Sequence, residues 1–278
     1  MVYLKLHDFQ QDKPAAAARI LDFLSLCPAL QVFDFCGLPV DVRRSAKQTV
    51  HLPVLRVMHL RETCVGRDLL THMHMPALEE LHMSQLNVAF VGINGYQESG
   101  DSDDEAGDFS RSPYSDRLTG MMMRSLFRRC NPPLRVLDFD YVDMRTKDFL
   151  WCFAHMPHLE EFRIVASDMS DTVIDALGEP LDDEENWPLP RLRHLVLRDC
   201  NMIRGAVVGR MITARSVAGL LPAHYDVALC ERVERRTVEI GLEDVVSMVG
   251  LTVYVEDVPP KEEPSMDAAV QEMHNMEE

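Results

Sequence analysis

The sequence predicts an α/β fold built from repeated units, each with one short strand and a helical or irregular return. The main observation is an eight-residue frame, P-x-L-x-x-Φ-x-Φ with Φ a large apolar residue, which occurs six times. The copies begin at Pro28, Pro53, Pro76, Pro132, Pro157 and Pro190, at intervals of 25, 23, 56, 25 and 33 residues. The shorter intervals are typical of repeat proteins, in which stacked units form a continuous core with a parallel sheet inside and helices outside.

Each part of the frame has a physical role. The tail alternates, as in Phe33-Asp34-Phe35. A period of two places the apolar pair on one face of a strand and the middle residue on the other. The leading proline has a fixed φ and no N–H to donate, so it suits a turn just before a strand and would break the interior of a helix.

The elements are expected in the following order. Residues 2–6 form a first strand without a preceding cap, and Asp12 and Pro14 open a helix as its N-cap and first-turn proline. An apolar face is predicted for this helix from Ile20, Leu21, Phe23 and Leu24. The frame strands are predicted at 32–35, 57–60, 80–83, 136–139, 161–164 and 194–197.

The returns between these strands carry most of the predicted helices. Arg43 to Lys47 is read as a polar return. Helical spacing of apolar residues predicts helices or helical turns at 68–72, 118–130, 145–156, 171–177 and 205–221. The apolar face of the helix at 118–130 is predicted to contain Met121, Met122, Leu126 and Phe127. That of the helix at 205–221 is predicted to contain Val208, Met211, Ile212 and Val217. Beyond the last frame we expect strands at 226–229, 238–240 and 251–255 and a helix at 242–249.

The chain is expected to divide into four parts. Residues 1–96 and 118–256 are repeats, the first set without an N-terminal cap. Between them, residues 97–117 are predicted to be a disordered insertion, because the run 98–108 is acidic and has no large apolar residue to bury. Residues 257–278 are predicted to be an acidic disordered tail. In the insertion, Ser102 with Glu105 three residues later and Ser112 before Pro113 are candidate phosphorylation sites, with an unmodified linker as the alternative.

Composition narrows the classes of partner and compartment. With 45 acidic and 28 basic residues the formal net charge is −17, which disfavours nucleic acid and anionic membrane as partners and permits basic proteins. Seven cysteines without a C-x-x-C pair are typical of a reducing compartment. There is no signal-peptide pattern and no apolar run of membrane-spanning length. We therefore expect a cytoplasmic or nuclear protein.

The sequence carries no motif for chemistry. It has no phosphate-binding glycine loop, no G-x-S-x-G and no H-E-x-x-H. The strongest metal candidate is the pair His72 and His74, with His82 nearby, although this segment also simply precedes Pro76. Cys200 is read as a buried thiol and not as a nucleophile. We expect a protein that is not an enzyme and has no catalytic residue, cofactor or metal.

One face of the predicted sheet is the candidate site. The residues between the buried strand apolars point away from the core and form a row, and flanking polar residues are expected on the same face or at its edge. The row consists of Asp34, His59, His82, Asp138, Arg163 and Val196, and the flanking residues are Glu80, Glu161, His194, Arg61, Asp140 and Arg198. This face is interpreted as a polar surface that binds a protein partner, with a merely solvated sheet face as the alternative.

The L-x-x-L-x-L core of the frame resembles the leucine-rich-repeat superfamily. The proline-led form, with Leu195-Val196-Leu197-Arg198-Asp199-Cys200 near its end, is similar to the repeat half of fungal F-box/leucine-rich-repeat proteins. The resemblance implies a horseshoe-shaped solenoid with a concave parallel sheet and convex helices. The asparagine or cysteine typical after the strand is met by Cys200, while the other copies have Leu38, Thr63, Leu86, Val142 and Ser167.

The resemblance also implies a function. It suggests a non-catalytic interaction scaffold that recognises the substrate of an F-box-type ubiquitin ligase through its concave face. The sequence has no counterpart of the F-box, so a Skp-type adaptor is expected as a partner only if that segment lies upstream. The alternative is an acidic leucine-rich-repeat protein that binds basic partners such as histones, independently of a ligase.

Overall fold

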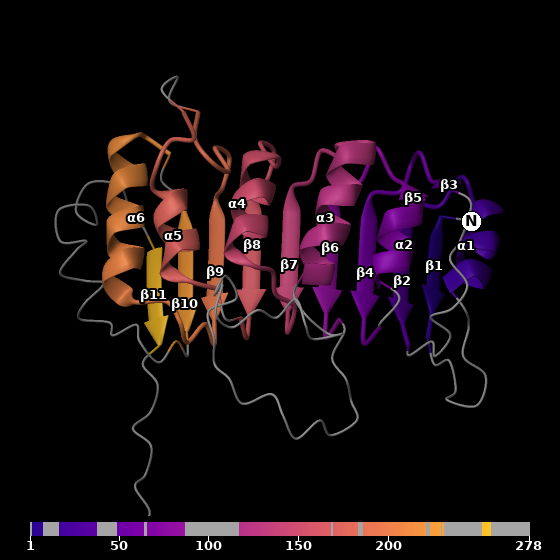
Figure 1. The fold of residues 1–278 in the computed structure, drawn as a ribbon, viewed down its shortest axis with the longest axis horizontal. Helices are drawn as coiled ribbons and strands as arrows, with labels where there is room; N and C mark the ends of the chain where they lie inside the picture. The colour runs from indigo at the N-terminus through magenta and orange to yellow at the C-terminus, as the bar shows by residue number, and fades with distance from the viewer. Residues whose placement is uncertain are drawn as a thin grey trace, which may run out of the picture.

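A parallel β-sheet runs the length of the described structure (Figure 1). The computed structural model describes residues 2–7, 17–37, 49–63, 66–86, 117–167, 169–182, 186–220, 223–228, 230 and 252–256. The nine strands of this sheet are β1 (Tyr3–Leu6), β2 (Val32–Cys36), β4 (Val57–Arg61), β6 (Glu80–Ser84), β7 (Val136–Asp140), β8 (Glu161–Val165), β9 (His194–Arg198), β10 (His224–Ala228) and β11 (Thr252–Glu256). Their order in the sheet is their order in the chain, and every neighbouring pair is parallel.

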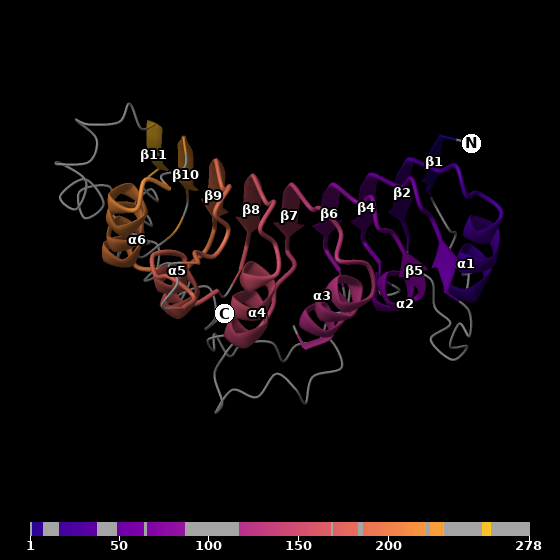
Figure 2. The same ribbon diagram turned by 90° about the horizontal axis from the view of Figure 1, so that it is seen from above.

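The helices lie on one side of this sheet. They are α1 (Ala17–Ser25), α2 (Gly66–His72), α3 (Arg117–Cys130), α4 (Thr146–Ala154), α5 (Asp171–Leu177) and α6 (Gly205–Val217). Each helix contacts the next along the chain. Two short parallel strands, β3 (Val50–His51) and β5 (Met73–His74), form a separate pair. In Figure 2 the row of strands bends so that its ends turn away from the helices. We call the sheet face that is turned away from the helices the open face. The predicted α/β class with a parallel sheet is confirmed.

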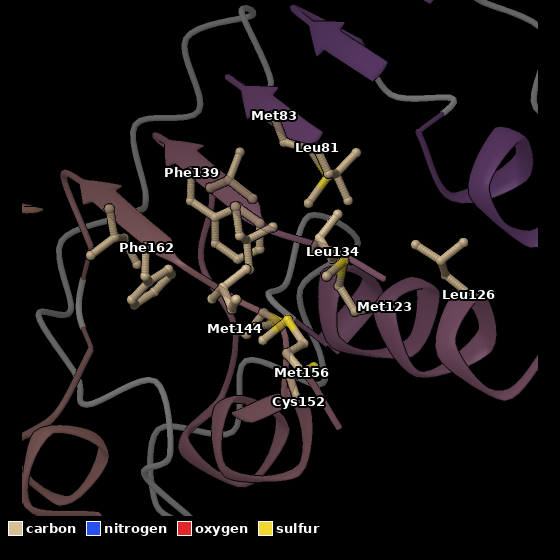
Figure 3. Packing of buried hydrophobic residues seen from close by; sticks show 14 of the residues in the cluster. Leu81, Met83, Met123, Leu126, Leu134, Phe139, Met144, Cys152, Met156 and Phe162 are labelled. Atoms are coloured by element: carbon tan, nitrogen blue, oxygen red, sulfur yellow. The ribbon is translucent and has the colours of Figure 1, made fainter. Parts of the chain in front are cut away.

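The register aligns the six frames with one another. The first apolar residue of each tail, such as Met58 in β4, pairs with its counterpart in the next strand, Leu81 in β6. The two resulting rows are fully or almost fully buried: Phe33, Met58, Leu81, Leu137, Phe162 and Leu195, and Phe35, Leu60, Met83, Phe139, Ile164 and Leu197. Figure 3 shows the central part of this core, where the sheet residues Leu81, Met83, Phe139 and Phe162 face Met123 and Leu126 of α3 and Cys152 of α4.

In five of the six copies the frame proline occupies a turn before the strand, as predicted, and Pro132 is the exception. In five copies the amide of the frame leucine donates to the carbonyl of the residue that precedes the proline, for example Leu55 to Leu52 at 3.2 Å and Leu159 to Met156 at 3.1 Å. In the remaining copy Leu134 donates to Pro132 itself at 2.8 Å. In the same five copies the residue before the proline is also buried, whereas Asn131 is exposed, and this position was outside the predicted frame. Its buried occupants are Cys27, Leu52, Met75, Met156 and Leu189.

Every frame strand from β4 to β9 is followed directly by a residue with left-handed backbone. These residues are Glu62, Gln85, Tyr141, Ala166 and Asp199, with φ between 50° and 55°. Their amides donate to the last carbonyl of the next strand, as Tyr141 does to Val165 at 3.0 Å. The position two residues after the strand is then turned into the core, where Thr63, Val142 and Cys200 are buried. Burial at this position therefore does not require the asparagine or cysteine of the typical repeat.

Three predicted core residues are exposed instead. Phe23, Met121 and Val217 were assigned to apolar helix faces, but all three are exposed, Val217 to 87%. With about 100° of rotation per residue, Val217 lies nearly opposite Val208, and Met121 nearly opposite the centre of its helix's buried face. The helix predicted at 205–221 also ends earlier, at Val217. Gly219 has a φ of 70°, and the amide of Leu220 donates back to Arg215 at 2.8 Å, which closes the helix with a glycine cap.

Several other predictions differ in bounds or lie outside the described residues. The strand predicted at 226–229 begins at His224 and ends at Ala228, and the last strand is at 252–256 and not 251–255. Arg117, placed in the insertion, is the first residue of α3. The opening of the first helix at Asp12 and Pro14, the return from Arg43 to Lys47, the strand at 238–240, the helix at 242–249, residues 97–116 and the tail 257–278 are outside the described part.

Candidate functional site: the open face of the sheet

The structure places the predicted site residues in register on the open face. Across β2, β4, β6, β7, β8 and β9 the paired residues are Asp34, His59, His82, Asp138, Arg163 and Val196. A second row, two residues earlier in each strand, contains Glu80, Glu161 and His194. Lys5 and Asp226 extend the first row at its two ends, and sequence analysis did not include them. Their strands lack the complete frame, so the pattern could not identify them.

Three aspartates of this row are each paired with an arginine of a neighbouring strand. Asp34 accepts two hydrogen bonds of 2.8 Å from Nη2 of Arg61, and Nζ of Lys5 lies 3.8 Å away. Asp138 accepts from Nη1 of Arg163 at 3.1 and 3.3 Å. Asp226 pairs with Arg198.

This pairing corrects one expectation. Asp34 was predicted to face a partner, but it is only 6% exposed, because Arg61 and Lys5 lie beside its carboxylate and carry the charge at the surface. A partner would therefore meet the arginine and the lysine before it reached the aspartate.

Two histidines stack at the centre of the face. The ring centroids of His59 and His82 are 4.4 Å apart, with planes 17° from parallel. Nδ1 of His82 lies 3.3 Å from Oδ2 of Asp138, and its Nε2 lies 3.4 Å from Oε2 of Glu80. Burial opposes protonation of His82, but the two carboxylates overcome it and raise its pKa above the ordinary value. Burial and the neighbouring His82 lower the pKa of His59.

We expect the two stacked histidines to titrate on opposite sides of their ordinary pKa of 6.5. His82 should remain protonated in the folded protein as pH rises through 6.5, and its contribution to stability should be lost progressively as pH rises from 6.5 through its raised pKa. In the folded protein His59 should stay neutral as pH falls below 6.5, whereas in the unfolded chain it takes up a proton. Stability should therefore decrease as pH falls from 6.5 towards the lowered pKa of His59. Proton NMR of the ring protons measures both values.

Matched variants test the cause of the His82 shift. Asp138→Asn removes the carboxylate bonded to Nδ1 and should lower the pKa of His82. Asp140→Asn removes an equal charge from the same strand, but Asp140 accepts from Ser84 and makes no contact with His82, so this pKa should change less. Equal shifts in both variants would contradict a specific role for the His82–Asp138 bond.

The other candidates do not converge. His74 lies in β5 with its ring 5.0 Å from that of His51, whereas His82 is on the open face. Among the described residues no group of three histidine, cysteine or carboxylate side chains is placed to hold a metal. The Cys200 thiol is buried, and its hydrogen bond with Cys230 and this burial raise its pKa. Ser102 and Ser112 lie outside the described residues.

A ladder of alternating charges borders the open face where the strands begin. The residue after each frame leucine alternates in charge from the second copy onward: Arg56, Glu79, Arg135, Glu160 and Arg193. Nε of Arg56 lies 3.7 Å from Oε1 of Glu79, and Arg135 donates two hydrogen bonds to Glu160 at 3.0 and 3.1 Å. Sequence analysis missed this ladder, although the alternation can be read from the aligned frames.

The comparisons with known proteins do not assign the chain to a family. It matches no protein-family model and no curated protein. None of the helices in the described ranges combines the length and the apolar composition needed to cross a membrane.

Proposed function

We propose that this chain is a leucine-rich-repeat solenoid of the horseshoe type and that its open face binds a protein partner without catalysis. The strand order supports the solenoid, because each frame copy contributes the next strand and the helices all lie on the opposite side (Figure 2). The observation that carries the binding proposal is the open face itself. Within the described part of the chain it bears aligned rows of histidines, carboxylates and arginines and no covering helix.

Two roles fit a scaffold of this kind. By resemblance to F-box/leucine-rich-repeat proteins, the open face would recognise the substrate of a ubiquitin ligase, and the Skp-type adaptor would bind elsewhere. The second role is that of an acidic repeat protein that binds basic partners such as histones outside any ligase. The net charge of −17 favours this second role, because it attracts basic proteins over distances of about a Debye length.

Affinity capture from native lysate, with three baits, tests the proposal. The wild-type chain is compared with an open-face variant, His59→Ala with His82→Ala and Arg163→Ala. A control variant changes the exposed helix-side residues Arg19, Asp22 and Thr172 to alanine. We expect a discrete partner that the wild type and the control retain and the open-face variant loses. Loss in both variants, or in neither, would contradict the open face as the binding surface.

The identity of the captured partner separates the two roles. A Skp-type adaptor that co-purifies with a cullin supports the ligase role. A discrete partner without these proteins supports a stand-alone recognition module. Basic proteins that modest salt elutes equally from all three baits would assign binding to the acidic segments of the chain and overturn the open-face proposal.

A further inference from the structure

The open face has a hollow where β6, β7 and β8 begin. Its volume is about 260 Å³, and it is lined by Glu79, Glu80, Arg135, Val136, Glu160, Glu161, Arg193 and His194. The register explains the hollow, because Glu80 pairs with Val136 and Val136 with Glu161. The short valine therefore lies between two long side chains whose strands are about 10 Å apart, twice the spacing of neighbouring strands. The hollow has an apolar floor and a carboxylate on each side.

Within the described ranges these two carboxylates are paired with histidines. Oε2 of Glu80 lies 3.4 Å from Nε2 of His82, and Oε2 of Glu161 lies 3.7 Å from Nδ1 of His194. Neither glutamate pairs with a lysine or arginine among the described residues. Their side chains are 43% and 39% exposed, so both can accept further hydrogen bonds.

The two arginines on the rim interact with another carboxylate, that of Glu160. Arg135 donates both of its hydrogen bonds to Glu160, and Arg193 is close enough to help lower the pKa of that same carboxylate. The other glutamate of the rim, Glu79, is paired with Arg56. Within the described part of the chain, Glu80 and Glu161 therefore have only histidines as ion-pair partners, and neither forms an ion pair with a lysine or arginine.

We propose that this hollow receives an arginine side chain from an extended basic segment of the partner protein. The aliphatic stem would lie on Val136, and the planar guanidinium, with donors on both edges, would bridge the carboxylates of Glu80 and Glu161. The inference rests on the proposed function of the open face and adds the chemistry of the partner. It places recognition of a basic segment on the folded sheet and not on the acidic run 98–108.

The probe is a short glycine-serine peptide with one central arginine, compared with the same peptide carrying citrulline, a neutral group of similar shape. Both are titrated into the isotope-labelled full chain and followed by NMR. We expect the arginine peptide to shift the signals of Val136 and of the Glu80 and Glu161 carboxyls. Glu80→Gln with Glu161→Gln should weaken binding about ten-fold or more, because two charge-assisted hydrogen bonds lose their charge.

Two controls remove the same kind of charge elsewhere. Asp22→Asn with Glu179→Gln neutralises two exposed carboxyls on the helix side. A second control neutralises Asp101, Asp103, Asp104 and Glu105 in the acidic run. Both should bind the arginine peptide about as well as the wild type. Unchanged melting temperatures in all variants establish that the fold is intact.

Three results would overturn the inference: equal binding of the citrulline peptide, equal affinity of the Glu80 and Glu161 variant, or loss of binding when the acidic run is neutralised. These results are separable from failure of the proposed function. If the lysate partner depends on His59, His82 and Arg163 but the arginine peptide shows no preference, the scaffold stands and the hollow is not an arginine site. If no partner depends on the open face, both proposals fall.

Discussion

Replacing Arg215 with alanine should lower the free energy of unfolding by about 3–5 kcal/mol. The guanidinium is fully buried beneath the last repeats, and its pKa is lowered by that burial. Nη1 donates to the carbonyls of Leu177 and Pro188 at 2.9 and 3.0 Å, and Nη2 donates to Leu189 at 2.8 Å. The side chain thus joins α6 to the end of α5 and to the turn before β9.

The size of the effect follows from the groups that would be left without partners. Each buried carbonyl that loses its donor costs about 1–3 kcal/mol, and the alanine leaves a cavity as well. One of these carbonyls belongs to Leu189, whose φ of 47° is itself unfavourable for a residue with a side chain. Arg215→Lys keeps the charge but has no planar fork to reach all three carbonyls, so it should also be clearly destabilising.

Chemical denaturation followed by circular dichroism measures this loss, with Arg210→Ala as the matched control on the same helix. Arg210 also pairs with α5, through Asp175 at 2.9 and 3.0 Å, but its side chain is exposed. The loss for Arg210→Ala should be about 1 kcal/mol or less. Equal losses of stability in the two variants would contradict a special stabilising role for the buried hydrogen bonds of Arg215.

The burial and the hydrogen-bond partners of Arg215 could not be predicted from the sequence. The frame identified six strands and their buried residues, because a period of two depends only on neighbours along the chain. An arginine near the end of a helix is normally read as exposed, and its partners here lie 26, 27 and 38 residues away. Only the stacking of one repeat on the next brings those carbonyls to the guanidinium.

The ends of the strands were also missed for a physical reason. Arg61, Ser84 and Asp140 still pair in the ladder, although each strand was predicted to stop one residue earlier, at its last apolar side chain. Pairing is made by the backbone and continues for as long as the neighbouring strand does. The left-handed positions that follow are occupied by residues such as Tyr141 and Ala166. None of them is a glycine or asparagine, the residue types that would indicate a left-handed backbone in the sequence.

The candidate site was predictable as a row but not as a set of partners. Alternation placed His82 and Asp138 on one face, and equal frames placed them in register. Which charges are neutralised depends on neighbours in adjacent strands. Asp34 is covered by an arginine, whereas Glu80 and Glu161 are paired only with histidines among the described residues. The hollow over Val136 has the same origin, because it exists only when three strands are laid side by side.

The second large effect is expected at Asp148, where the helix layer holds a buried carboxylate between two arginines. Oδ1 of Asp148 accepts from Nε of Arg124 at 2.7 Å, and Oδ2 accepts from Nε of Arg145 at 3.2 Å. Asp148→Ala should cost about 3 kcal/mol, the lower end of the range for breaking a buried ion pair, because both arginines are partly exposed and can turn to water.

Gly120 makes this expectation testable in a second way. A Cβ added at Gly120 would meet Cγ of Asp148 at 2.3 Å, so the α3–α4 contact at this point requires glycine. Gly120→Ala should therefore destabilise the wild type by about 1–3 kcal/mol. An Asp148→Gly background removes the carboxylate and also the Cβ of residue 148, which would otherwise lie 2.7 Å from the added Cβ. In this background the same change should stabilise the protein by up to about 1 kcal/mol through helix propensity.

A double-mutant cycle in urea measures the coupling between the two positions. The sign of the Gly120→Ala effect should reverse when Asp148 is removed, which gives a coupling of about 2 kcal/mol or more. Additive losses would mean that the glycine is required by something other than the carboxylate. A reversal would show that Asp148 fixes the approach of α3 to α4, the helices that lie over β6 and β8 in Figure 1.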